Sequence, residues 1–359
     1  MKRLLVSLLA ITAWSVTLAC SSAVVAPHLS KEGGVIIWKH RDQTATNDCH
    51  IAHFKGGKYA YTALVNSYVG VGTTALGGVN EVGFGYISTA TKNLHRQPAV
   101  ARTRNSKYSL MVHALRECKS VDEFEALLST YHRSASFESN VGVGDAEGNA
   151  AYFEIWSDGY RRYDVKDFDV RTNFSFAATT NIRGSSERRY RTVMEQMKGQ
   201  KGFCSQDFID YSRCFWSADK GDVLASATPY KDANYVVPRA SSVAAIVIVC
   251  SKNPRIDAIV GHPVSGMVVP VWVAAEHNIP RCVAGREMYD LGRKFVSKAY
   301  IPKAGEKGLY LNKELVSKVL KVNHDIPAPN RVPTDIIKFN NKIDAIFEKH
   351  HSQMMQLLQ

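Results

Sequence analysis

Short apolar runs alternate with polar turns along most of the chain after residue 20, which is the pattern expected of β-strands. At the start of this region "SSAVVA", "PHLSKEGG" and "VIIWKHRD" predict a strand, a turn and a second strand. Further strands are predicted at "TTALGGVNEVGFGYIST", "SNVGVGDAEGNAAYFEIW", "VRTNFSF", "SSVAAIVIVC" and "GMVVPVWVAA". The apolar runs of the last two have the length of buried strands and are too short to span a membrane.

Helical periodicity appears between these strands and again at the C-terminal end. It is found in "SLMVHALREC", "SVDEFEALLSTY" and "SSERRYRTVMEQM", and Ser120 and Glu123 are spaced for a capping box. A long final helix is predicted from Thr334, with one apolar face made by Ile336, Phe339, Ile343, Ile346 and Phe347. Strands grouped into sheets with helices outside them predict a layered α+β domain.

The first nineteen residues have the layout of a secretory signal peptide: Lys2 and Arg3, an apolar run over residues 4–18, then Ala19. We expect residues 1–19 to be removed and the protein to be exported, to the periplasm or the medium. Residues 20–359 contain no linker-like or repeated segment, so we expect a single domain with a C-terminal helical extension from about residue 334. No transmembrane segment is expected after the signal is removed.

Charge and cysteine content narrow the function classes. The formal net charge is +12, but the basic residues are scattered, which favours a solvated basic surface over a nucleic-acid site. No CxxC or HExxH spacing indicates a metal, and no cofactor motif is present. Of the seven cysteines, the six after Cys20 could form up to three disulfides, although Cys250 at the end of an apolar strand is equally well a buried thiol.

Cys20 lies where the export signal ends and the first strand begins. A free α-amine titrates near pH 7.7–8.0 and a thiol near 8.5, so on one residue the amine can accept the thiol proton. If the hairpin turns near Lys31, paired residue numbers sum to about 62, which predicts Cys20 opposite Asp42. Lys39 and Arg41 on the same second strand would raise the thiolate fraction.

These residues belong to an ordered set of motifs: Cys20 before a strand, then "IIWKHRD", "GGVNEVGFGYIS", "GDAEGNAAYFEI", "VRTNFSF" and "SSERRYRTV". The set, over roughly residues 20–195, resembles the choloylglycine hydrolase and acyl-CoA:6-aminopenicillanate acyltransferase-like branch of the N-terminal nucleophile hydrolases. The resemblance implies a four-layer αββα sandwich. It also implies a small-molecule substrate that carries an N-acyl group.

The resemblance further assigns roles to single residues. Cys20 would be the nucleophile and, through its amine, the general base, and Asp42 would orient that amine. Asn173 would donate to the oxyanion, and Arg189 would lie near the nucleophile. Lys39 stands where a bile-salt hydrolase has arginine. Without the resemblance, the simpler interpretations are a turn-side carboxylate for Asp42, a strand-end amide for Asn173 and an exposed helix residue for Arg189.

Two classes of function follow. The first is an exported cysteine amidohydrolase that cleaves a linear, non-peptide C–N amide bond through an acyl-thioester on Cys20, or an acyltransferase that uses the same acyl-enzyme. The second is a non-catalytic lipoprotein, acylated on Cys20, that binds a ligand or partner. Thr17 and Leu18 reverse the order that a lipid-attachment signal favours, which indicates a free cysteine. Apolar segments at 59–61, 84–87 and 174–176 could form an acyl pocket.

Overall fold

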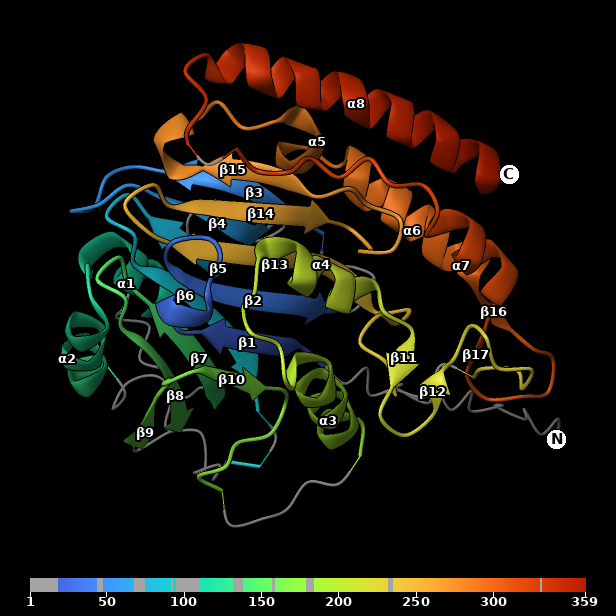
Figure 1. Ribbon diagram of the computed structural model, residues 1–359, viewed down its shortest axis with the longest axis horizontal. Coiled ribbons are helices and arrows are strands. Elements are labelled where there is room, and N and C mark those ends of the chain that lie inside the picture. The colour runs from blue at the N-terminus through green and yellow to red at the C-terminus, as the bar shows by residue number, and fades with distance from the viewer. Residues whose placement is uncertain are drawn as a thin grey trace, which may run out of the picture.

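Two large antiparallel sheets form the centre of the molecule and pack face to face (Figure 1). The computed structural model describes residues 19–43, 48–67, 75–91, 93–94, 110–131, 138–156, 159–178, 184–231, 235–329 and 331–359. In spatial order, the first sheet contains β10 (Phe168–Arg171), β1 (Ser21–Val25), β2 (Val35–Asp42), β13 (Ser242–Cys250), β14 (Arg255–Val260) and β15 (Val269–Trp272). The second sheet contains β3 (Cys49–Phe54), β4 (Tyr61–Asn66), β5 (Ala75–Asn80), β6 (Gly85–Ala90), β7 (Ser139–Gly144), β8 (Ala150–Trp156) and β9 (Gly159–Asp164).

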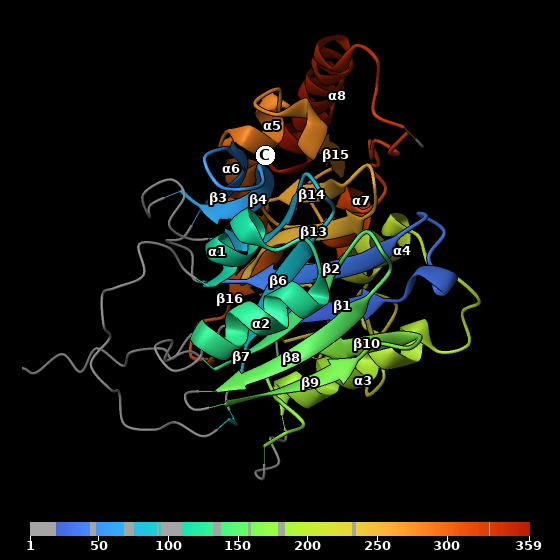
Figure 2. The same ribbon diagram turned by 90° about the vertical axis from the view of Figure 1, so that its left-hand side faces the viewer.

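Helices cover the outer face of each sheet (Figure 2). The second sheet is covered by α1 (Leu110–Glu117) and α2 (Val121–Tyr131), and the first by α3 (Ser185–Met197) and α4 (Ser205–Arg213). At the start of α2, Ser120 Oγ accepts the Glu123 amide hydrogen at 3.2 Å, whereas the Glu123 carboxylate accepts from Lys119 N, one residue before the capping-box position. The four layers confirm the αββα architecture.

Most of the remaining elements lie toward the C-terminal end of the chain, and one 3-10 turn lies near its start. They are α5 (Arg281–Ala284), α6 (Glu287–Ala299), α7 (Lys313–Val319) and α8 (Ile336–Leu357), the 3-10 turns η1 (Pro27–Leu29) and η2 (Val273–Ala275), and the hairpins β11 (Trp216–Ser217) with β12 (Gly221–Asp222) and β16 (Tyr300–Pro302) with β17 (Leu309–Leu311). Asp335 caps α8 by accepting from Lys338 N at 2.9 Å. Ile343 and Phe347 are buried, so the predicted final helix and its apolar face are confirmed.

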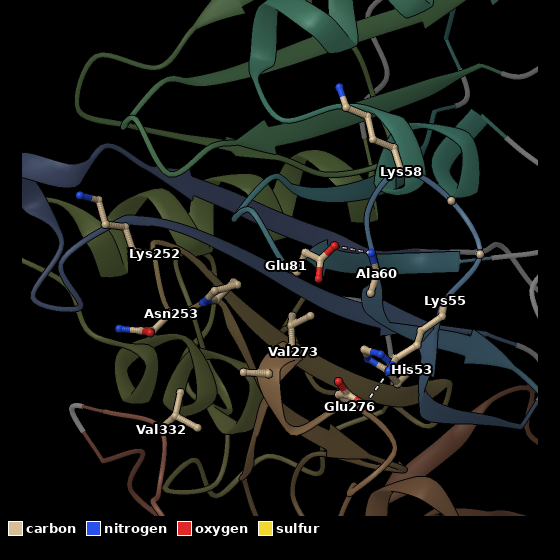
Figure 3. Close-up of a pocket in the computed structure, with 14 residues that line it drawn as sticks. His53, Lys55, Lys58, Ala60, Glu81, Lys252, Asn253, Val273, Glu276 and Val332 are labelled. Atoms are coloured by element: carbon tan, nitrogen blue, oxygen red, sulfur yellow. Dashed lines mark hydrogen bonds and ion pairs between the residues drawn. The ribbon is translucent and has the colours of Figure 1, made fainter.

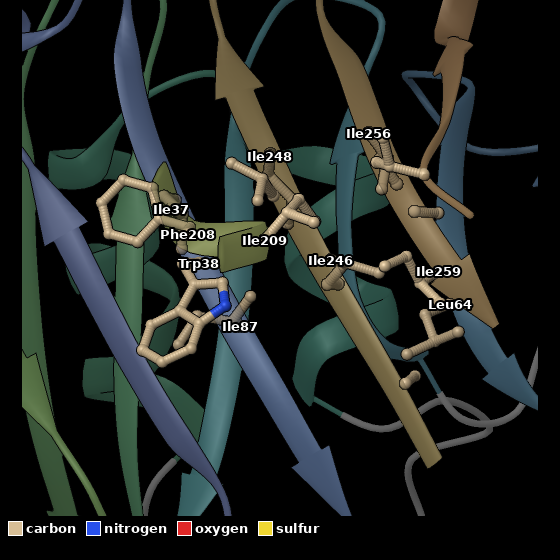
Figure 4. Packing of buried hydrophobic residues seen from close by; sticks show 14 of the residues in the cluster. Ile37, Trp38, Leu64, Ile87, Phe208, Ile209, Ile246, Ile248, Ile256 and Ile259 are labelled. Atoms are coloured by element: carbon tan, nitrogen blue, oxygen red, sulfur yellow. The ribbon is translucent and has the colours of Figure 1, made fainter. Parts of the chain in front are cut away.

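The main core lies between the sheets and between the first sheet and its helices (Figure 4). Strands β1, β2 and β13 are buried at every position because both of their faces are covered. Toward α4, Trp38 donates to Ser212 Oγ at 2.9 Å and its ring lies 5.8 Å from that of Phe208. Toward the second sheet, a Cβ on Gly85 would lie 2.3 Å from Cys250 Sγ, so glycine permits the close approach of the sheets there.

Several sequence-based expectations are refined by the structure. The strand predicted at "VRTNFSF" ends at Arg171, and residues 172–178 are irregular. All seven cysteines lie in the described part of the chain and all are free thiols, and Cys250 is buried as expected of a core residue. Among the described residues, no helix combines the length and the apolar character that crossing a membrane requires.

Candidate active site

Cys20 lies directly before β1, at the end of the sandwich where β2 ends with Asp42. Ser22 faces the second sheet, because its hydroxyl oxygen accepts hydrogen bonds from Thr89 at 3.2 Å and Tyr152 at 3.0 Å. Side chains alternate along a strand, so the Cys20 position belongs to the same inner face, between the sheets. Cys20 is 8% exposed, which leaves the thiol in a largely desolvated setting.

Lys39 occupies the inner face of β2 opposite Ser22. Its ammonium donates to the backbone carbonyl of Ser88, and the side chain is 3% exposed. Burial lowers the pKa of Lys39, while the charge of the Cys20 thiolate and a hydrogen bond with it act in the opposite direction. Lys39 therefore places a buried amine beside Cys20, and a neighbouring cation is what stabilises a thiolate.

Arg189 connects two of the predicted site residues. It extends from α3 and donates through Nη1 to the Cys20 carbonyl oxygen at 2.6 Å and to Ser21 Oγ at 2.9 Å. Through Nη2 it donates to Asn173 Oδ1 at 2.9 Å, while Asn173 Nδ2 donates to the Ala90 carbonyl at 2.7 Å. Burial, and next the charge of Arg239, lower the pKa of Arg189 to about 9. Arg189 is fully buried, so the simpler prediction of an exposed helix residue is wrong.

The predicted pairing of Cys20 with Asp42 is wrong by one residue. Ser21 pairs with His40 and Ser22 with Lys39, so paired numbers sum to 61 rather than 62. A symmetric turn about Lys31 would give 62, but the connection contains the 3-10 turn η1 and does not pivot on that residue. Because a slip of one residue moves a side chain to the other face of a sheet, Asp42 lies on the face opposite to Ser22 and Lys39.

Asp42 is linked to the segment at Ala19, directly before Cys20, through Arg239, a residue that the sequence did not predict for the site. Arg239 Nη2 donates to Asp42 Oδ2 at 2.6 Å and to the Ala19 carbonyl at 3.2 Å, and Ser242 Oγ donates to Asp42 Oδ1 at 2.7 Å. Burial raises the pKa of Asp42, but Arg239, followed by His40, outweighs burial and holds that pKa well below its ordinary value. The sequence signal for Arg239 is an arginine shortly before β13, a strand that is apolar after Ser242.

Arg41, the other predicted cation of β2, is directed elsewhere. Its Nη2 donates to Asn66 Oδ1 of β4 at 2.7 Å, and the residue is 4% exposed. His40 bonds Ser242 Oγ at 2.8 Å, and His262 Nε2 lies 3.0 Å from the Arg239 carbonyl. These two histidines therefore support the Asp42–Arg239 pair. Across the described residues, no cluster of three or more histidine, cysteine or acidic side chains is arranged to hold a metal ion.

Of the three apolar segments considered for an acyl pocket, only the one at 174–176 lies beside the site. Tyr61, Phe84 and Tyr86 are fully buried in the core under α1 and α2. Phe176, by contrast, is 45% exposed, and the rings of Phe174, Phe176 and Tyr190 lie 5.3–5.7 Å apart in edge-to-face contacts.

Comparison with known proteins gives matches among solved structures alone: no family model and no curated protein matches the sequence. One match is a Caenorhabditis elegans N-acylethanolamine-hydrolyzing acid amidase ortholog, with 16% identity, TM-score 0.42, and coverage of 64% of this chain and 92% of that one. The penicillin V acylase from Agrobacterium tumefaciens has 13% identity, TM-score 0.45, and coverage of 71% and 86%. A mutant conjugated bile acid hydrolase from Clostridium perfringens has 12% identity, TM-score 0.45, and coverage of 71% and 93%. Because the identities and TM-scores are this low, the chemistry of the site has to be argued from its own geometry.

Proposed function

We propose that this protein is an exported cysteine amidohydrolase that cleaves a linear, non-peptide C–N amide bond of a small N-acyl substrate. The observation that carries the proposal is the hydrogen-bonded chain from Cys20 through Arg189 to Asn173, with Lys39 beside the thiol. It brings a nucleophile, a neutral amide donor and a buried cation to one end of the sandwich. These are the parts that acyl transfer to a thiolate requires.

The reaction begins once residues 1–19 are removed and Cys20 has a free amine. The amine accepts the thiol proton, and the sulfur attacks the substrate carbonyl carbon while the carbonyl electron pair moves to oxygen. The side-chain amide of Asn173 carries two hydrogens, and the one not bonded to Ala90 is the donor for this oxyanion. The C–N bond then breaks, and the leaving amine takes its proton from the Cys20 ammonium.

Water completes the cycle by attacking the thioester carbonyl, with the Cys20 amine as general base, which releases the carboxylic acid and restores the thiol. In this proposal Asp42, held in place by Arg239, orients the Cys20 amine that is freed when Ala19 is removed. Lys39 favours the thiolate by its charge. No metal or other cofactor takes part.

Burial around Cys20 supports this proposal over a lipid anchor. Cys20 is 8% exposed, and its carbonyl group accepts a hydrogen bond from the fully buried Arg189. A cysteine that carries a diacylglyceryl group must reach a membrane surface. Intact-mass analysis of exported protein should therefore give a chain that begins at Cys20 without added lipid, and lipid on the bulk of the protein would refute the enzyme proposal.

The test of function is release of amine from N-acyl amino acids, conjugated bile salts and penicillin V by protein that begins at Cys20. Cys20→Ala should be folded and inactive, and Cys20→Ser should retain little activity because a hydroxyl is a far weaker nucleophile. Added hydroxylamine traps the acyl-thioester as a hydroxamate and so reports the acyl-enzyme, while the ratio of acid to transferred acyl product with an ordinary amine acceptor distinguishes a hydrolase from an acyltransferase. Equal amine release by wild type and Cys20→Ala would exclude Cys20 as the nucleophile.

A further inference from the structure

Residues 172–178, here called the Asn173 loop, follow β10 without forming a strand. Several of their backbone polar groups are nevertheless bonded, because side chains from the second sheet and its neighbouring segments take the place of a partner strand. Buried backbone groups left without partners are costly, so side chains that satisfy them determine where the loop lies.

Two asparagines hold the first half of the loop. Asn140 of β7 donates through Nδ2 to the carbonyl oxygens of Thr172 at 3.0 Å and Phe174 at 2.7 Å. Asn93 accepts the Ser175 amide hydrogen at 2.7 Å through Oδ1 and donates to the Ser175 carbonyl at 2.8 Å through Nδ2. The backbone on either side of Asn173 is therefore fixed by neutral amides.

Glu154 of β8 holds the second half. Its carboxylate accepts from the backbone N–H groups of Phe176 at 2.9 Å and Ala177 at 2.6 Å, and from Arg171 Nε at 3.0 Å. Glu154 is fully buried and Arg171 is 2% exposed. The Arg171 guanidinium also lies over the Phe176 ring, 4.5 Å from its centroid. A single carboxylate thus sets both the backbone and the ring position of Phe176.

Burying a carboxylate and a guanidinium carries a desolvation cost that an apolar pair of similar size would avoid. Here the buried pair does more than fill space in the core. Glu154 accepts hydrogen bonds from the Asn173 loop, in which Phe176 is 45% exposed. Three residues before Phe176 along the same loop lies Asn173, bonded to Arg189 at 2.9 Å. The Glu154–Arg171 pair therefore fixes a loop that contains both Asn173, near Cys20, and the partly exposed Phe176.

We propose that Glu154 is a positioning residue for the amide-cleaving reaction: by holding the Asn173 loop it sets the Asn173 amide toward the oxyanion and presents Phe176 to the acyl group. This inference rests on the proposed function. It adds a residue that touches neither substrate nor nucleophile and acts through backbone hydrogen bonds. Displacement of a catalytic donor by about 1 Å can cost on the order of 10²-fold in rate, which is the scale on which such a residue acts.

The test compares Glu154→Gln with Asp325→Asn in protein that begins at Cys20. Asp325 is a matched control, because its carboxylate also accepts from an arginine, Arg213 at 2.8 Å, and from a backbone amide, Val268 N at 2.7 Å, in the C-terminal part of the chain. Glutamine puts an NH2 donor where one carboxylate oxygen accepts a backbone N–H, and it carries no charge to balance Arg171. We expect kcat to fall about 10- to 100-fold with KM for amide substrates changed less than threefold. Glu154→Asp, which keeps the charge, should recover part of kcat.

Two further measurements separate positioning from general damage. Hydrogen exchange at residues 172–178 should accelerate at least tenfold in Glu154→Gln and stay unchanged in Asp325→Asn. Alkylation of Cys20 by iodoacetamide should proceed at the wild-type rate, since the thiol is not altered. Unchanged exchange in the loop, or a kcat within twofold of wild type, would overturn the inference. If wild type releases no amine from any substrate, the proposed function fails instead, whatever the exchange result.

Discussion

The two ends of the sandwich differ in how deeply their charged side chains are buried. At the nucleophile end, Lys39, Asp42, Arg189 and Arg239 are at most 3% exposed, and each is bonded to another polar group there. At the other end a cavity of about 420 Å³ is lined by His53, Lys55, Glu81, Lys252 and Glu276, among others (Figure 3). There the Lys55–Glu276 ion pair of 2.6 Å joins side chains that are 51% and 56% exposed.

Strand β2 shows that these regions are at opposite ends. It begins at Val35, paired with Cys250 just before the cavity residues 252–254, and it ends with Asp42. In water an exposed ion pair contributes about 0–1 kcal/mol, whereas buried charges shift each other's pKa values strongly. Burial lowers the pKa of His53 in the cavity, but the cavity's ion pair is half exposed, whereas the charged groups at the Cys20 end are buried together. Buried, mutually perturbed charges cluster at functional sites, which supports placing the proposed reaction at the Cys20 end.

The largest expected effect tests the nucleophile end through Asn173. Asn173→Ala removes the proposed oxyanion donor, so kcat should fall by about 10²–10³-fold while KM changes little. Arg189 loses one acceptor but keeps the Cys20 carbonyl and Ser21 hydroxyl, so the fold should be retained. Steady-state amine release and circular dichroism check both parts. Turnover near wild type in a folded variant would remove Asn173 from the chemistry.

The next effect concerns the Asp42–Arg239 pair. Asp42→Asn leaves Arg239 as an uncompensated buried charge, which typically costs about 3–5 kcal/mol of stability, and it removes the negative charge that acts on Arg189 beside Cys20. We expect kcat/KM to fall by about 10- to 100-fold in the fraction that remains folded. The free energy of unfolding in urea and the rate of amine release are the measurements.

A double-mutant cycle isolates the pair from its surroundings. Arg239→Met with Asp42→Asn removes both charges, so the double variant should be more stable than the sum of the single changes predicts, by at least about 1 kcal/mol. Strict additivity of the two changes would show that the ion pair does not organise this end.

The sequence predicted the sheets better than the site. Alternating apolar runs such as "VIIWKHRD" define strands locally, and the motif order around Cys20, Asn173 and Arg189 indicated which residues meet. The hairpin register needed the shape of the connection, which a sum of residue numbers does not contain. Arg239 was missed because its contact with Asp42 spans 197 residues and depends on β13 lying next to β2.

A smaller effect is expected from the titration of His262, which makes the free energy of unfolding depend on pH. Burial, and next the positive charge of His40, lower the pKa of His262 from 6.5 to about 3. Between those values the unfolded chain binds a proton that the folded chain excludes, so stability is complete above about pH 6.5 and falls as the pH drops toward 3.

The measurement is urea unfolding at pH 7.5 and pH 5.0 for wild type and His262→Gln. Glutamine removes the titrating group and keeps a polar atom near the Arg239 carbonyl, so the variant should lose roughly 1–2 kcal/mol less than wild type over this interval. An equal loss in both proteins would mean that other groups cause the acid sensitivity.

The smallest effect is expected at the cavity end, and it is the sharpest test of the comparison. His53→Gln and Lys55→Gln each remove a charge or proton site that lines the cavity without touching the nucleophile end. The Lys55–Glu276 pair is half exposed, so its loss should change the free energy of unfolding by less than about 1 kcal/mol. Because β2 separates the two ends, kcat/KM for amine release should stay within twofold of wild type. A tenfold loss in either variant, with the fold intact, would mean that the cavity takes part in the reaction and that burial of charge does not mark the site.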